Sequence, residues 1–382
     1  MRFTSKFVLS LALLLIASSA LPAQGEELVT TCGQTVSGAA RLVADLDCSG
    51  EPLPSLVFGS SGTLQLDGHT LTGEVAGSVL RIEIVGPGTI TGPGYGVSNG
   101  GVVAFGSQIV VRDAAIERNE RTGLVAFAVG ANAAVQVYDS SITGNGTSGS
   151  GSGLAAGVTV TCPFTGCDPL QKAVVKNSIV ADNASSGVAA SDVTVLGSIL
   201  TNNGGHGILL TNRDSTRKLK IRNSTVDHNG GYGIRISSWR HARVVARDTS
   251  VSYNDIGIYD PTTNFKGRVQ LKRVTLEGNR VGIQVPAQNP RPHENDGRVT
   301  MVDSSIIDSI ENGVLMGFPM PLAMRRSSVT GSGSGPECGV SIACADLNTG
   351  IEPRFRSDST CGKSHVDRTG IPGETWGICA ND

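Results

Sequence analysis

Basic side chains recur at two fixed positions of a repeating pattern, in a chain that is otherwise close to neutral. The chain has 382 residues and a formal net charge of −2, yet residues 204–300 hold 16 Lys and Arg against 8 Asp and Glu. The first position is occupied by Lys218, Arg243, Arg268 and Arg298, and the second by Arg112, Lys176, Arg222, Arg247 and Lys272. Evenly spaced positive charge suits a polyanion whose charges also repeat, such as a uronate polysaccharide. The simpler alternative is that long basic side chains only cover an exposed sheet and protect it from aggregation.

A short stretch next to these cations holds further groups suited to contact a sugar. Trp239 stands in the sequence SSWRHA beside Arg240 and His241. A tryptophan flanked by bases suits a saccharide contact, and it suits a cap over a loop equally well. Only 4% of the residues are aromatic, so stacking platforms for neutral sugars or nucleic-acid bases are scarce. We therefore expect an acidic polysaccharide as the partner, and no nucleic acid.

An asparagine marks each period of the repeat that spaces these residues. Most of these asparagines lie 25 or 26 residues apart, and a glycine follows nearly all of them by three or four positions. They are Asn119, Asn145, Asn183, Asn203, Asn229, Asn254 and Asn279. A fixed period of this length indicates a solenoid. The segments are β-branched, rich in Gly and Asn, and free of a 3.6-residue period, which excludes helical repeats.

Alternating apolar residues indicate how the solenoid displays the cations. Apolar residues stand ten, eight and three positions before each asparagine and again after the glycine, which predicts three short strands per coil. The basic positions, eleven and seven before the asparagine, flank the apolar pair and share the outer face. Because stacked coils lie about 4.8 Å apart, we predict two parallel basic ladders on one sheet. We expect turns at the asparagine, helped by its tolerance of left-handed geometry, and at the Asp- and Asn-rich position six before it. The glycine is expected to allow a tight exit.

Residues 61–335 resemble the right-handed parallel β-helix superfamily, the pectin-lyase-like fold, in the asparagine ladder and in the order of strands and loops. The resemblance implies an all-β chain, a single right-handed parallel β-helix of roughly ten coils with cysteine-bearing terminal caps. Insertions around 146–170 and 286–297 come just before the strand that carries the cations. By resemblance this strand belongs to the first sheet, where enzymes of this fold bind saccharides. The fold hosts many activities and does not fix one of them.

Lyases of this fold commonly use an arginine or lysine to take the proton at C5 of the sugar. By that resemblance the catalytic candidates are Arg243, Arg247, Arg268 and Lys218, and the substrate-binding candidates are Arg222, Lys272, Arg298, Trp239, His241 and His293. Such lyases often hold the substrate carboxylate through calcium, so Ca²⁺ is the cofactor that the resemblance suggests. The loop aspartates Asp214, Asp260 and Asp296 form no cluster in the sequence. We therefore assign no metal site.

Two short fragments resemble other enzymes of this fold. Pro292-His293-Glu294 is similar to the Asp-Pro-His-Glu mark of alginate epimerases, with Arg291 in place of the aspartate. His206 between two glycines and Arg235 one coil later resemble the histidine and arginine marks of polygalacturonases. The aspartate pair that those hydrolases use as general acid and base has no counterpart here, and the repeat alone can generate the match.

The N-terminal residues and the number of cysteines both predict that the protein is exported. Residues 1–23 read as a signal peptide, with Arg2 and Lys6 before a short apolar core and small residues at its end. No stretch is long enough to predict a membrane span, and we expect a monomer that is secreted, periplasmic or at the cell surface. Eight cysteines favour disulfides, namely Cys32, Cys48, Cys162, Cys167, Cys338, Cys344, Cys361 and Cys379. We expect neighbours to pair, in an N-terminal cap at 24–60 and a C-terminal cap at 336–382, although the four C-terminal cysteines alone allow three connectivities.

The sequence thus predicts a secreted β-helix protein that binds an acidic polysaccharide on a basic outer sheet. Cleavage by β-elimination, as a polysaccharide lyase, and uronate epimerisation are the two catalytic alternatives. The rival hypothesis is a non-catalytic extracellular solenoid, a rigid rod that binds a structural or adhesion partner through its loops.

Overall fold

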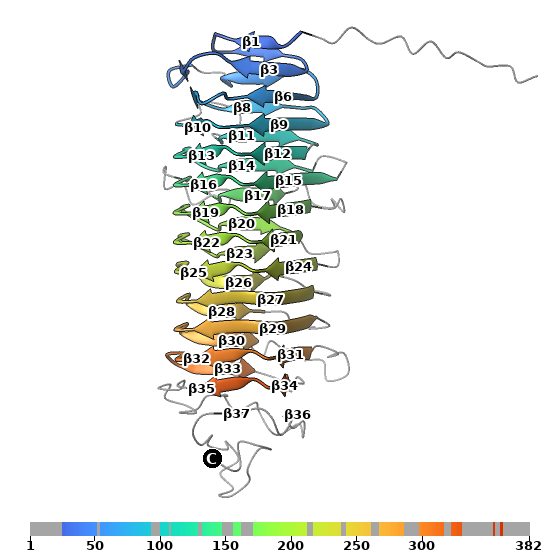
Figure 1. Cartoon of the computed structure of the whole chain (residues 1–382), viewed down its shortest axis with the longest axis vertical. Helices are drawn as coiled ribbons and strands as arrows, with labels where there is room; N and C mark the ends of the chain where they lie inside the picture. Colours follow the sequence, from blue (N-terminus) through green and yellow to red (C-terminus); the bar gives the residue numbers. More distant parts are fainter. Residues whose placement is uncertain are drawn as a thin grey trace, which may run out of the picture.

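The structure is a computed structural model, and it describes most of the chain between residues 25 and 330. The described ranges are 25–51, 54–92, 100–106, 108–128, 132–146, 156–161, 171–211, 217–237, 242–260, 267–285, 298–316 and 322–330, with two short strands at 354–355 and 360–361. Every regular element in these ranges is a β-strand (Figure 1). No helix in this part of the chain has the length and apolarity needed to cross a membrane.

Each coil contributes up to three strands, and each strand pairs in parallel with its counterpart one coil away. The first strands of the coils are β1 (Glu27–Val29), β3 (Ala39–Leu42), β6 (Gly62–Gln65), β9 (Arg81–Val85), β12 (Gln108–Arg112), β15 (Ala133–Tyr138), β18 (Gln171–Lys176), β21 (Asp192–Leu196), β24 (Arg217–Arg222), β27 (Ala242–Ser252), β29 (Arg268–Glu277), β31 (Arg298–Val302), β34 (Leu322–Arg325) and β36 (Arg354–Phe355). We call the outer side of these strands the first face.

The second strands join the same 25-stranded sheet, because β27 and β29 run through both positions. The separate ones are β4 (Leu46–Asp47), β7 (Thr70–Thr72), β10 (Thr89–Thr91), β13 (Ala115–Glu117), β16 (Ser141–Thr143), β19 (Ile179–Ala181), β22 (Ile199–Thr201), β25 (Thr225–Asp227), β32 (Ser305–Ile307), β35 (Ser328–Thr330) and β37 (Thr360–Cys361).

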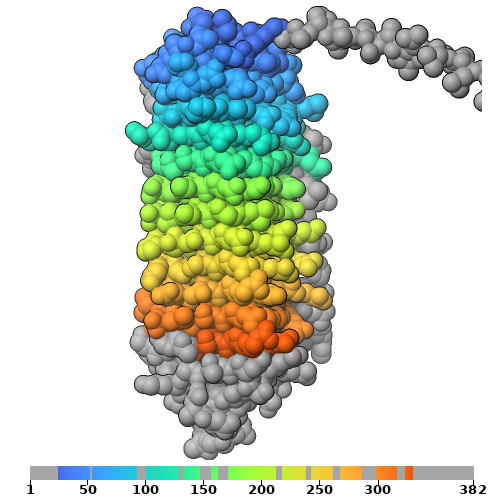
Figure 2. Space-filling view, viewed as in Figure 1, coloured from blue at the N-terminus to red at the C-terminus, as the bar shows by residue number. Residues whose placement is uncertain are grey.

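The third strands form a sheet of their own with twelve members. They are β2 (Gln34–Val36), β5 (Leu56–Phe58), β8 (Val75–Gly77), β11 (Val102–Phe105), β14 (Leu124–Phe127), β17 (Val158–Thr161), β20 (Val188–Ala190), β23 (Ile208–Leu210), β26 (Tyr232–Ile236), β28 (Ile256–Tyr259), β30 (Val281–Val285) and β33 (Asn312–Met316). Successive coils lie as layers along the long axis (Figure 2). The solenoid, the parallel strands and the all-β class were all predicted, with about ten coils expected.

One continuous apolar core runs down the inside of the coils, from Val29 to Val329. Alternate residues of the first strands supply it, as Leu219 and Ile221 do in β24, and both are at most 1% exposed. The residues between them face solvent, since β24 alternates buried and more exposed positions along its length. The predicted period of two therefore holds, and it fixes which side chains the first face presents.

The asparagine ladder is present as a chain of buried side-chain hydrogen bonds. From Asn119 to Asn254, each Nδ2 donates to the Oδ1 of the asparagine one coil on, and the last of these acceptors is Asn279, at distances from 2.8 to 3.3 Å. The left-handed residue of that turn is not the asparagine but the one before it, such as Asn202 (φ 54°) or His228 (φ 52°). The asparagine is selected instead because its amide both donates to and accepts from buried partners.

The repeat glycine is required by close stacking. A Cβ on Gly207 would lie 2.4 Å from Cγ1 of Val226 and 2.8 Å from the carbonyl oxygen of Gly233, one coil on. Gly207 does not have a positive φ. Our expectation that the glycine allows a tight turn is therefore wrong, and a glycine is needed because a side chain would not fit between the coils. The Asp- and Asn-rich turn was predicted correctly, since Asp139, Asn177, Asn223 and Asp248 all have φ between 48° and 50°.

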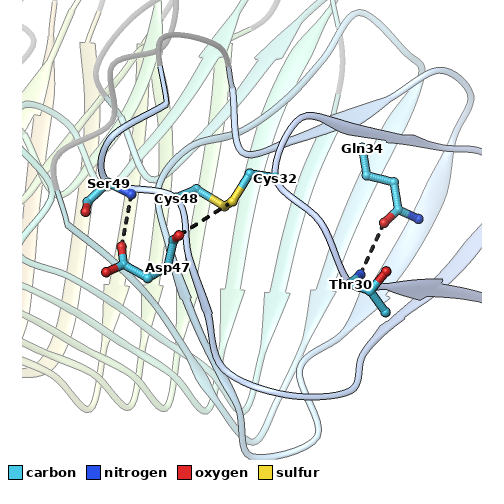
Figure 3. The surroundings of a disulfide bond; sticks show 6 residues. All are labelled: Thr30, Cys32, Gln34, Asp47, Cys48 and Ser49. Carbon is cyan, nitrogen blue, oxygen red and sulfur yellow. Dashed lines mark hydrogen bonds between the residues drawn. A yellow bond between two sulfur atoms is a disulfide. The ribbon is translucent and has the colours of Figure 1, made fainter.

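The N-terminal segment is already part of the solenoid. Residues 27–58, expected to form a cap, contribute β1 to β5, and β1 pairs with β3 while β2 pairs with β5. The predicted disulfide between Cys32 and Cys48 joins the first coil to the second. Figure 3 shows it beside Asp47, whose Oδ1 accepts a hydrogen bond from the Ser49 amide at 3.0 Å. Cys162, Cys167, Cys338, Cys344 and Cys379 lie outside the described residues, and Cys361 is described only as part of the backbone of β37.

Candidate functional site

The first face aligns the predicted cations in two columns. In the first column Lys218 pairs with Arg243, Arg243 with Arg268, and Arg268 with Arg298. In the second, Arg222 pairs with Arg247 and Arg247 with Lys272. The strand register thus places these seven side chains as the spacing predicted. We call them, together with Lys220 between the columns, the basic face.

The cations of the basic face are available to a ligand. All eight are exposed except Arg222, which is half-buried. Among the described residues, none of them lies within 4.0 Å of a carboxylate oxygen, whereas Arg112, Arg273, Arg280 and Arg326 all form ion pairs elsewhere. The Nε of Arg222 is buried without a hydrogen-bond partner in the same part of the chain. In the described ranges, therefore, no ion pair with a neighbouring acid neutralises the positive charge of this face.

Two aspartates stand in the turn beside the second column, but other arginines engage them. Arg273 donates to Asp248 through Nε and Nη2, and Arg326 does so to Asp303. Hydrogen bonding from Arg273 is the largest influence lowering the pKa of Asp248, and the charges of Lys272 and Arg222 lower it further. The Arg326 hydrogen bond likewise lowers the pKa of Asp303, with a contribution from Lys272. The basic face therefore acts on these carboxylates through space, without contact.

The spacing of the basic face favours an extended ligand. Adjacent members of a column lie on neighbouring strands, about 4.8 Å apart, and the two columns are four residues, or about 13 Å, apart along each strand. A polymer with a negative charge on each unit can meet several of these cations at once, whether it follows one column or crosses to the other. A single small anion can meet only one or two.

Towards the N-terminus the two columns are interrupted. Asp192 pairs with Lys218 on one side and with Lys172 on the other. In the second column Leu196 separates Arg222 from Lys176. Arg112 lies further up, where its guanidinium is bound to Glu83 at 2.9 Å. The basic face is thus confined to β24, β27, β29 and β31, and Arg112 and Lys176 do not join it.

The structure also adds a residue that the repeat columns missed. Lys220 is exposed between Lys218 and Arg222, at the position where the next two coils have Val245 and Gln270. The sequence indicates Lys220 only within its own strand, because three cations alternate along β24 in the sequence RKLKIR and the next coils do not repeat the middle one.

Trp239, His241 and His293 lie outside the described residues, as do Asp214 and Asp296. Within the described ranges no group of three or more His, Cys, Asp or Glu could hold a metal ion. Asp260, the remaining loop aspartate, is buried at the end of β28. Arg235 belongs to β26 of the third sheet and His206 lies in the turn just before β23, so neither lies on a strand of the basic face.

The order and stacking of the strands agree with a comparison against known families. The family model described as "right handed beta helix region" matches residues 156–264, which include β24, β27 and most of the basic face. No curated protein and no solved structure matches the chain. The stacked parallel strands and the asparagine ladder show that the chain folds as a parallel β-helix, and over residues 156–264 it is similar to this family.

Proposed function

We propose that this β-helix protein binds an acidic polysaccharide, a polymer of uronate units, along the basic face. The observation that carries the proposal is the absence of ion pairs on this face in the described part of the chain, where seven cations align in two columns. Long-range attraction would bring such a polymer to the surface, and contacts to several carboxylates would hold it there. β-Helix proteins commonly bind or cleave carbohydrates, which is consistent with this assignment.

The same face offers groups for β-elimination. One of Lys218, Arg243, Arg247 and Arg268 would take the proton from C5 of a uronate while the bond from C4 to the glycosidic oxygen breaks. The leaving oxygen takes up a proton from water and becomes the hydroxyl of a new reducing end, and the other fragment keeps a C4–C5 double bond. Return of a proton to the opposite side of C5, without bond cleavage, would be epimerisation. We propose binding as the function, and the assay below measures elimination separately.

The test neutralises the centre of the basic face. We expect the variant R243Q/R247Q/R268Q to bind polygalacturonate, alginate or a glycosaminoglycan on the order of ten- to a hundredfold more weakly, because exposed ion pairs contribute up to about 1 kcal/mol each. Its melting temperature should stay close to that of the parent, since these cations form no ion pair in the described structure. Affinity is measured by calorimetry at low and at physiological salt, and should fall as salt screens the charges.

The matched control changes net charge equally on other coils. R41Q/R81Q/R118Q removes three arginines from strands and a turn nearer the N-terminus, and its affinity should remain within a few-fold of the parent. Equal losses in both triple variants would show non-specific attraction and overturn the proposal. Ultraviolet absorbance of the unsaturated uronide, with and without Ca²⁺, reports elimination in the same samples.

A further inference from the structure

His206 and Arg235 meet on the outer side of the third sheet, on successive coils. His206 lies two residues before the start of β23, and Arg235 lies in β26, where it pairs in register with Leu209 of β23. The Nε2 of His206 lies 3.1 Å from Nη1 of Arg235. Its Nδ1 accepts a hydrogen bond from the backbone amide of Tyr232 at 3.1 Å. Both ring nitrogens therefore face N–H groups.

A neutral imidazole cannot satisfy two donors. It has one nitrogen with a lone pair and one that carries a proton. The Tyr232 amide is fixed by the sheet and donates to Nδ1, so Nε2 carries the proton and points it at the guanidinium, which has only donors. Protonation would not help, since it would leave two donors and add a positive charge. Burial first, and the charge of Arg235 second, hold the pKa of His206 down at about 4, so the ring is neutral at neutral pH.

Arg235 also has unused hydrogen-bonding capacity. Within the described residues its guanidinium has no carboxylate within 4.0 Å, and its Nε is buried without a hydrogen-bond partner. Neighbouring rings fix the position of the pair, because Tyr232 stacks on His206 with centroids 4.8 Å apart and planes 5° apart. The guanidinium lies 5.7 Å from the ring centroid of Tyr232. Tyr259, one coil further on, packs against Tyr232 with the two ring centroids 4.4 Å apart.

We propose that His206 and Arg235 form a second ligand site, in which one oxyanion accepts hydrogen bonds from Nε2–H of His206 and from the guanidinium of Arg235. An oxygen acceptor between the two would satisfy both donors and balance the charge of Arg235. The shared chemistry is that of a carboxylate, sulfate or phosphate group. This site is separate from the basic face, because it lies on the third sheet and uses none of its eight cations.

The site can be tested with small anions and the whole protein. The histidine Cε1 signals of the labelled protein are followed by NMR at neutral pH while sodium acetate, sulfate or phosphate is added at constant ionic strength. The signal of His206 is the one among six histidines that is missing in H206Q. We expect a saturable shift of this signal with at least one of the three anions, and the anion that saturates first identifies the preferred group.

Two variants of Arg235 and one of the basic face separate the possible causes. R235M removes the donors and should abolish the saturable shift, whereas R235K keeps the charge and should weaken it. Near-parental melting temperatures show that these variants are folded, and R235K alone suffices if R235M is not. The triple variant R243Q/R247Q/R268Q should keep the shift. Failure of every anion to saturate the signal, or loss of the shift in the triple variant, would overturn this site and leave the polysaccharide proposal untouched.

Discussion

His206 is a histidine whose pKa the fold lowers well below its usual value. Its pKa falls from 6.5 to about 4, mainly through burial and then through the charge of Arg235. The unfolded chain therefore binds this proton at a higher pH than the folded protein. His206 leaves stability unchanged above pH 6.5, and it lowers stability progressively as the pH falls from 6.5 towards 4.

We expect this loss to disappear when the imidazole is replaced. The shift corresponds to about 1 to 3 kcal/mol after allowance for partial solvent screening. The difference in unfolding free energy between the parent and H206Q, measured by urea denaturation, should therefore shift in favour of H206Q between pH 6.5 and pH 4. A difference that stays constant over this range would contradict a depressed pKa for His206.

At the scale of the coil, the asparagine ladder makes one residue of each turn indispensable. Asn203 donates to Asn229 Oδ1 at 2.9 Å and to the Val180 carbonyl at 3.1 Å, and it accepts from Asn183 Nδ2 at 2.8 Å. Asn203→Ala leaves these buried partners unsatisfied, at a cost of about 3 to 5 kcal/mol. Asn119→Ala should cost less, because Asn119 Oδ1 has no hydrogen-bond partner in the described structure. Equal losses of melting temperature in the two variants would argue against the ladder as the cause.

The repeat glycine gives a second prediction at this scale. Gly207→Ala should lower the melting temperature strongly, because its Cβ would overlap Val226 and the backbone of the next coil. Gly50→Ala is the matched control, since no atom lies within 4 Å of a Cβ at that position. It should melt within a degree or two of the parent. A tolerated Gly207→Ala would mean that neighbouring coils can separate without cost.

The features that could be predicted from the sequence are those that stacking enforces in every coil. Asparagines, glycines without room for a Cβ, and inward-facing Val and Ile recur at fixed positions because each coil packs against the same kind of neighbour. These positions can therefore be found from the period of the sequence. The identity of the left-handed residue could not be predicted, since Asn202, His228 and Tyr253 share no side-chain chemistry that marks the position. The limits of the basic face could have been predicted from the same columns, because Asp192 and Leu196 stand eleven and seven positions before Asn203, and the strand register places them next to Lys218 and Arg222.

At the scale of the whole molecule, side chains at the same position of successive coils line up on one face of the solenoid, so a residue type repeated in several coils becomes a continuous surface. In the described residues the basic face lies on β24 to β31 and the proposed His206 site lies next to β23, β26 and β28, so the two proposed sites occupy neighbouring coils on different sheets. In a stack where each coil contacts mainly its neighbours, a ligand on one face need not disturb the other. We therefore expect R235K, which changes only the third sheet, to bind polysaccharide within a few-fold of the parent affinity in the same calorimetry.

The direction of the asparagine hydrogen bonds has a consequence for how the protein can change in length. Every asparagine-to-asparagine bond of the ladder donates towards the C-terminal end. Each interior asparagine therefore presents an acceptor to the coil before it and a donor to the coil after it, and this makes interior coils equivalent. Deleting residues 242–266 would bring Lys218 onto Arg268 and Ile234 onto Ile283, the partners of the excised Arg243 and Ile258. We expect this shortened protein to fold, with circular dichroism of the same shape as the parent, whereas deletion of residues 242–254 should leave mismatched turns and prevent folding. The number of coils is then free to vary in evolution, while the geometry of each coil is not.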